Sequence, residues 1–201
     1  MLTRRHLIAA TALAFPLPAM AAGKPVVTIL GDSITAGLGL PASAAFPARL
    51  QAELARLGKS ATIRPAGVSG DTTAGGLARV DFSVQNDTTL CIVALGGNDL
   101  LQGLKPANTR ANLDAIVKRL KARKIHVLLA GLAAPPAIGG GYARDFNAVF
   151  PAVAKAQGVA LYPNLLAGAA GLTQRDGIHP NAKGAAIIAQ RLAPVVARAL
   201  G

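Results

Sequence analysis

VVTILGDSIT, residues 26–35, is a short, largely apolar run that passes directly into Gly31, Asp32 and Ser33. An uncharged run of this length, closed by glycine and aspartate, is typical of a buried strand in a parallel sheet. Further short apolar runs along the chain predict strands over 61–64, 90–95, 125–130 and 159–162. We therefore expect five strands.

Segments with helical spacing separate these runs. Apolar residues that recur at intervals of three and four predict helices over 46–57, 72–80, 113–120 and 142–156. The last predicted helix runs from about Pro180 to Leu200, and Pro194 inside it should kink or split it. This alternation predicts one domain over residues 22–201, an open parallel α/β sheet with helices on both faces.

Composition excludes several classes of protein. With 52% hydrophobic residues the chain is not disordered, and its single cysteine excludes a disulfide framework or a zinc site made of thiolates. That residue, Cys91, lies in an apolar run and is expected to be buried and inert. The net charge is +12, but aromatics are only 3% and no basic run occurs, so nucleic acid is not the expected partner. Weak attraction to anionic membrane surfaces remains compatible with the charge.

The first residues have the pattern of an export signal. Arg4 and Arg5 precede an apolar stretch that runs to about Leu17, and Ala19-Met20-Ala21 fits a signal peptidase site. The paired arginines favour a twin-arginine signal over a general secretory one. We expect cleavage after Ala21 and a periplasmic or secreted protein.

Only three histidines are available as a general base. His6 lies in the predicted leader, and His126 begins the fourth predicted strand, at the sheet edge opposite the expected site. His179 remains as the candidate general base, in a polar loop before a helix. Asp176, three residues earlier, is spaced so that one turn can bring its carboxylate to the imidazole. A surface ion pair is the alternative explanation for that spacing.

A serine nucleophile is expected at the same edge. Ser33 follows the first strand directly, where its hydroxyl would be exposed and its N–H would face a developing anion, although an N-cap role is the alternative. Ser69 competes, but Asp71 breaks the G-x-S-x-G pattern around it. The N–H of Gly70 and the amide of Asn98 could complete an oxyanion hole with the N–H of Ser33.

Four blocks in this order resemble those of the GDSL, or SGNH, hydrolases, and are most similar to the thioesterase I and arylesterase branch. The blocks are Gly31-Asp32-Ser33-Ile34, Gly70-Asp71, Gly96-Gly97-Asn98-Asp99 and Asp176-Gly177-Ile178-His179-Pro180. The resemblance implies a three-layer, flavodoxin-like fold and hydrolysis of esters and thioesters through an acyl-enzyme, without metal or cofactor. It assigns Ser33 as nucleophile, Asp176 and His179 as the rest of the triad, and Gly70 and Asn98 as oxyanion donors. Pro65 stands where that branch usually has asparagine. Because proline removes a backbone donor, we expect it to shift the loop that carries Gly70, so the geometry of the oxyanion hole is the part that the resemblance supports least.

The loops after the third and fourth strands supply the expected substrate pocket. Leu100, Leu101, Leu132 and Ile138 are apolar but not aromatic, which predicts a shallow pocket for short or medium acyl chains. Gly139–Gly141 is predicted to be a flexible surface turn. A carbohydrate O-acetyl esterase with the same triad, a non-catalytic lipid- or glycan-binding relative, and a basic interaction protein are the alternatives.

Overall fold

The computed structural model describes residues 23–201, so the predicted leader and its cleavage site lie outside the described part. Five parallel strands form one sheet in the order β2-β1-β3-β4-β5. Their bounds are Val26–Gly31 for β1, Thr62–Gly67 for β2, Thr88–Ala94 for β3, His126–Ala130 for β4 and Ala160–Tyr162 for β5. This is the flavodoxin-like order predicted above, with the strand order reversing between β1 and β3.

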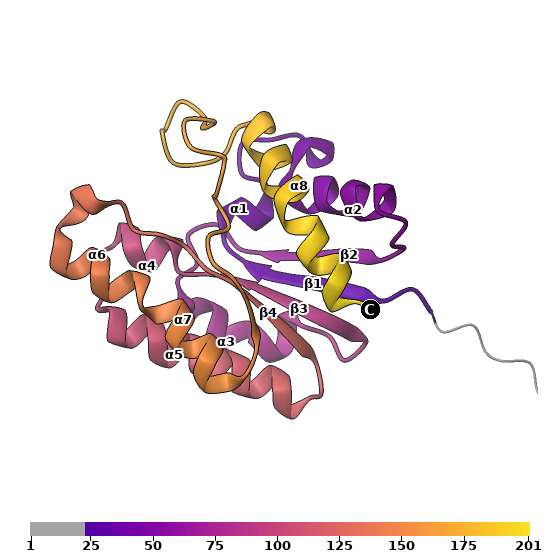
Figure 1. Cartoon of the computed structure of the whole chain (residues 1–201), viewed down its shortest axis with the longest axis horizontal. Helices are drawn as coiled ribbons and strands as arrows, with labels where there is room; N and C mark the ends of the chain where they lie inside the picture. Colours follow the sequence, from indigo (N-terminus) through magenta and orange to yellow (C-terminus); the bar gives the residue numbers. More distant parts are fainter. Residues whose placement is uncertain (1–22) are drawn as a thin grey trace, which may run out of the picture.

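Helices cover both faces of the sheet, as expected (Figure 1). The helices α2, Phe46–Arg56, and α8, Ala182–Ala199, pack together over one face. The helices α3, Thr73–Ser83, α5, Pro106–Ala122, and α7, Val149–Gln157, cover the other. Within the described residues, no helix is both long enough and apolar enough to cross a membrane.

The core consists of the strands and the apolar stripes of these helices. Leu90, Cys91, Ile92 and Val93 in β3 are 0–1% exposed because a central parallel strand is covered on both faces. Cys91 is buried as predicted, and burial raises the pKa of its thiol to about 12. The thiol is therefore protonated and unreactive.

Two expectations about helices are wrong. The single helix predicted over 142–156 is two helices, α6, Gly140–Asn147, and α7, which meet at Ala148. Pro151 explains the break, because it has no N–H to donate to the carbonyl of Asn147 four residues earlier. Residues 140 and 141 belong to α6, so the glycines predicted to form a flexible turn instead begin a helix.

Pro194 does not split α8, which runs without a break from Ala182 to Ala199. The carbonyl left without a donor belongs to Gln190, which is exposed, so water can satisfy it. Ala193 and Val196 beside the proline are buried, and this packing stabilises the continuous helix.

Pro65 lies in β2, at the edge of the sheet, without interrupting the strand. The backbone N–H groups of Thr62 and Val68 donate to the carbonyls of Pro25 and Gly31, so the N–H groups of the even-numbered residues in β2 point toward β1. The N–H that Pro65 lacks would point to the open side, where a proline removes no ladder hydrogen bond. The substitution is therefore compatible with a regular strand up to Gly67.

Candidate active site

The site lies at the carboxyl ends of β1 and β3, where the strand order reverses. The short helix α1, Ser33–Ala36, begins directly after β1, and α4, Gly97–Leu101, begins three residues after β3. Gly96 precedes α4 with a φ of 120°, and a side chain there would meet the ring of Phe150. Glycine is needed at this turn because both the backbone angle and the close ring exclude a Cβ atom.

Ser33, His179 and Asp176 form a hydrogen-bonded chain. Ser33 Oγ lies 2.8 Å from His179 Nε2, and His179 Nδ1 lies 2.6 Å from Asp176 Oδ2. A neutral ring with its proton on Nδ1 donates to Asp176 and leaves Nε2 to accept the proton of the Ser33 hydroxyl. The structure brings these three predicted side chains together.

Asp176 accepts hydrogen bonds from the backbone as well as from the imidazole ring. Its Oδ1 accepts from the backbone N–H groups of Ile178 and His179, at 2.9 and 3.0 Å. The hydrogen bond from His179, followed by these two amides, lowers the pKa of the Asp176 carboxyl to about 2. The carboxylate is therefore ionised at neutral pH and fixes the orientation of the ring.

The loop that carries His179 is tied to the rest of the site by Gln174. Its backbone N–H donates to the carbonyl of His179 at 2.8 Å, and its side-chain Nε2 donates to Leu38 just beyond α1 and to Pro180. Gln174 therefore connects the loop of the base to the segment of the nucleophile. Sequence reasoning did not single it out, because a glutamine in a polar loop has no distinctive pattern.

Ser33 is not the N-cap of its helix. Asp32 takes that position, and its Oδ1 accepts from the N–H of Ile34 at 3.0 Å, which leaves the Ser33 hydroxyl to His179. Asp32 is 4% exposed and lines the pocket beside Ser33. Burial raises the pKa of the Asp32 carboxyl from 3.8 to about 6. This buried acid next to the nucleophile was not anticipated as an ionisable group of interest.

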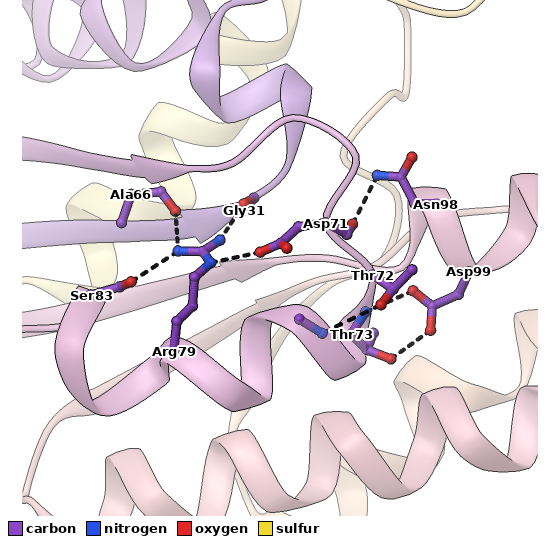
Figure 2. A network of polar contacts seen from close by, with 10 residues as sticks. Gly31, Ala66, Asp71, Thr72, Thr73, Arg79, Ser83, Asn98 and Asp99 are labelled. Carbon is purple, nitrogen blue, oxygen red and sulfur yellow. Dashed lines mark hydrogen bonds and ion pairs between the residues drawn. The ribbon is translucent and has the colours of Figure 1, made fainter.

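The predicted oxyanion donors lie after β1, β2 and β3, at the same edge of the sheet. Asn98 lies in the first turn of α4 and lines the pocket with Ser33 and His179. One hydrogen of its Nδ2 is donated to the carbonyl of Asp71 at 2.8 Å, which leaves the second for a ligand (Figure 2). Gly70 directly precedes Asp71 and has a φ of 85°, a conformation that favours glycine. The loop after β2 is thus joined to α4 beside the nucleophile.

The buried side chain of Asp99 connects α4 to α3 and α5. It is 1% exposed, and its carboxylate accepts from the Thr73 N–H at 2.7 Å and from the Thr73 hydroxyl at 2.5 Å (Figure 2). It also accepts from the Thr109 hydroxyl at 3.1 Å. These bonds fasten the helix of Asn98 to the starts of α3 and α5. Sequence reasoning placed Asp99 in a motif without assigning it this contact.

An apolar cavity of about 110 Å³ opens beside Ser33 and His179. Leu100, Leu101 and Leu132 line it as predicted. Ile138 is not part of the lining; it lies in the 3-10 turn Pro136–Ile138 and is 47% exposed. Residues that line the cavity without having been predicted are Ile34, Ala133, Leu166 and Ile178.

The other residues considered from the sequence lie elsewhere or lack partners in this site. His126 is exposed at the amino end of β4, at the far edge of the sheet as expected. Ser69 is exposed in the loop after β2, and the described hydrogen bonds do not connect it to His179. Among residues 23–201, no group of three or more His, Cys, Asp or Glu side chains could hold a metal ion.

A serine–histidine–aspartate chain at the switch point of a doubly wound sheet, with an asparagine amide lining the same pocket, defines the class of α/β serine hydrolases. Residues 29–187 match the model of the GDSL-like lipase/acylhydrolase family. The chain belongs to this family, and it is a carboxylic ester hydrolase.

Relatives and solved structures agree over most of the chain. Esterase TesA of Pseudomonas aeruginosa is 39% identical over 180 residues, 88% of this chain and 90% of that protein. Thioesterase 1/protease 1/lysophospholipase L1 of Escherichia coli K12 is 36% identical over 177 residues, 86% of this chain and 84% of that protein. The crystal structure of AlinE4, an SGNH-hydrolase family esterase, superposes with a TM-score of 0.73 at 42% identity, covering 90% of this chain and 99% of that one.

Proposed function

We propose that the protein hydrolyses carboxylic esters and thioesters through an acyl-enzyme on Ser33, with His179 as general base and Asp176 as its orienting carboxylate. The observation that carries this proposal is the unbroken chain from Ser33 Oγ to His179 Nε2 and from His179 Nδ1 to Asp176 Oδ2, at 2.8 and 2.6 Å. Ser33 and His179 are 146 residues apart in sequence, so local chain geometry does not explain their contact.

The acylation step follows from this geometry. Ser33 Oγ attacks the acyl carbon while its proton passes to His179 Nε2, and Asp176 stabilises the resulting imidazolium. The carbonyl oxygen becomes an oxyanion that accepts from the N–H groups of Ser33 and Gly70 and from Asn98 Nδ2. By analogy with measured losses, each donor contributes about 3 kcal/mol to transition-state stabilisation. When the oxyanion collapses, the bond between the acyl carbon and the oxygen or sulfur of the leaving group breaks, and the alcohol or thiol takes the proton from His179.

Deacylation reverses the roles. A water molecule gives its proton to His179 as its oxygen attacks the acyl carbon, and the second oxyanion is held by the same donors. When it collapses, the bond to Ser33 Oγ breaks, His179 returns the proton to Ser33 and the free acid leaves.

The size and lining of the cavity support the inference that it binds short and medium acyl chains. Its apolar lining contains leucine, isoleucine and alanine without an aromatic side chain, and it is about 110 Å³ in volume. Each buried methylene contributes about 0.8 kcal/mol, but only while the cavity has room for it. We infer a preference for such acyl groups and for aryl or thiol leaving groups, which depart readily.

Substitutions of the triad test the proposal. With p-nitrophenyl butyrate and a butyryl thioester, S33A and H179A should lose several orders of magnitude in kcat with the fold retained. D176N should lose less, because the ring keeps its other contacts. The matched controls S69A and H126A remove the same side chains elsewhere and should leave kcat unchanged. Near-normal turnover by folded H179A would contradict the mechanism, and faster hydrolysis of acetylated sugars than of either ester would favour the O-acetyl esterase alternative.

We also propose that the protein is exported. The support is the order of Arg4 and Arg5, the apolar stretch and Ala19-Met20-Ala21 in the sequence, with the first strand beginning only at Val26. Cleavage after Ala21 would remove the whole leader and leave β1 intact.

A further inference from the structure

Arg79 in α3 is the centre of a polar network at the edge of the proposed active site (Figure 2). Its guanidinium donates to the Asp71 carboxylate at 2.6 Å, to the carbonyls of Gly31 and Ala66 at 2.8 and 2.9 Å, and to the Ser83 hydroxyl at 3.0 Å. The side chains of Arg79 and Asp71 are only 18% and 15% exposed. A largely shielded charge with four acceptors is held in one orientation.

The acceptors belong to the segments that carry the oxyanion donors. Gly31 ends β1 two residues before Ser33, and Ala66 lies near the end of the neighbouring strand β2. Asp71 follows Gly70 directly in the loop after β2. One guanidinium therefore joins the end of the nucleophile's strand to the loop of the second donor.

The third donor is connected through the backbone of Asp71. Its carbonyl accepts from Asn98 Nδ2 at 2.8 Å, while its carboxylate is held by Arg79 (Figure 2). The position of Asp71 thus fixes the rotamer of the Asn98 amide and the direction of its free hydrogen. A shift of Asp71 would move Gly70 and Asn98 together relative to Ser33.

Helix α3 is adapted to this ion pair at Gly75. A Cβ atom at Gly75 would lie 2.4 Å from Asp71 Oδ1, so the carboxylate occupies space that any other residue would fill. Glycine is otherwise unfavourable inside a helix, by about 1 kcal/mol relative to alanine. Its presence in the first turn of α3 is explained by the close approach of Asp71.

We propose that Arg79 is a positioning residue for the oxyanion hole. This inference rests on the proposed function and deepens it: Arg79 does not touch the substrate but sets the relative positions of the three donors through Asp71 and Gly31. Lysine could keep the charge beside Asp71 but could not reach the two carbonyls and the hydroxyl with one planar group.

The test compares R79Q and R79K with R64Q. Arg64, in the edge strand β2, is a matched control because it too pairs with an aspartate, donating to Asp87 at 2.6 and 2.8 Å, but outside the site. For each folded variant, the measurements are kcat and KM with p-nitrophenyl butyrate, the inhibition constant of butylboronic acid and the thermal midpoint. The boronate forms a tetrahedral adduct on the serine, so its affinity reports the oxyanion hole.

R79Q should lower kcat by about 10- to 100-fold, because misplacing reacting groups by about 1 Å costs about 100-fold. KM should change little, boronate affinity should fall in parallel with kcat, and R79K should lie between R79Q and the parent. R64Q should match the parent in all three. If R79Q does not fold, the comparison of R79K with R64Q decides the question.

Two outcomes would overturn the inference: an Arg79 variant that matches R64Q in kcat, or one whose kcat falls while boronate affinity is unchanged. Either would show a role in stability alone. Failure of the proposed function is separate, since it would appear as activity retained by S33A in the parent background.

Discussion

Replacing Asp32 with asparagine tests how far burial raises the pKa of this carboxyl. The side chain is 4% exposed, and burial raises its pKa from 3.8 to about 6. Asparagine has nearly the same shape and keeps an oxygen to accept from the N–H of Ile34, the hydrogen bond that caps α1. The variant therefore removes the ionisation and leaves the packing.

The magnitude follows from linkage between ionisation and folding. Below about pH 4 the Asp32 carboxyl is protonated in both the folded and the unfolded chain, and its stabilising contribution is fully present. As the pH rises through about 6, the folded carboxyl must ionise where ionisation is unfavourable, and this contribution is lost. At about 1.4 kcal/mol per pKa unit, the wild type should lose about 3 kcal/mol relative to D32N between about pH 4 and pH 7.

Urea unfolding of both proteins across this pH range measures the difference directly. The stability of D32N minus that of the wild type should rise by that amount and level off above about pH 7. D87N is the control of opposite sign, because the hydrogen bonds from Arg64 lower the pKa of the exposed Asp87 carboxyl, whose contribution is lost as the pH falls. A D32N difference that stays constant with pH would refute the reasoning.

The other predictions concern substrate and export. The kcat/KM for p-nitrophenyl esters should rise by about fourfold per methylene and level off well before about sixteen carbons; a rise that continues to sixteen would refute the shallow cavity. L132A should reduce kcat/KM for hexanoyl more than for acetyl esters, whereas I138A, outside the cavity, should change neither; equal effects of the two would count against this acyl site. Arg4→Lys combined with Arg5→Lys should leave the precursor in the cytoplasm, measured by fractionation, and unchanged delivery would instead favour the general secretory route.

The strands could be predicted because a strand that is buried on both faces is an uninterrupted apolar run in the sequence. The run from Leu90 to Ala94 is uninterrupted for that reason. Most helices could be predicted from the spacing of their apolar residues. Helix boundaries inside longer apolar segments were less accessible. Pro151 did carry the signal for the break at Ala148, but its effect depends on which carbonyl it deprives of a donor.

The meeting of Ser33, Asp176 and His179 could be predicted because so few residues can do the chemistry of a triad. Three histidines leave one candidate after His6 and His126 are set aside, and parallel strands bring the loops after their carboxyl ends together. Arg79 could not be found this way, since it is one of 21 basic residues and two of its four acceptors are backbone carbonyls. Which carbonyls a long side chain reaches is decided by tertiary packing.

The two edge strands of the sheet bear on whether the protein aggregates at high concentration. An open strand edge invites pairing with other chains, and this is a common route to aggregation. On β2, Pro65 offers no outward N–H, and that of Ile63 is already donated to Gln51 at 3.0 Å. On the other side, β5 has only three residues. Neither border presents a long row of free donors, so the folded enzyme should stay soluble at concentrations where a sheet with longer free edges would associate.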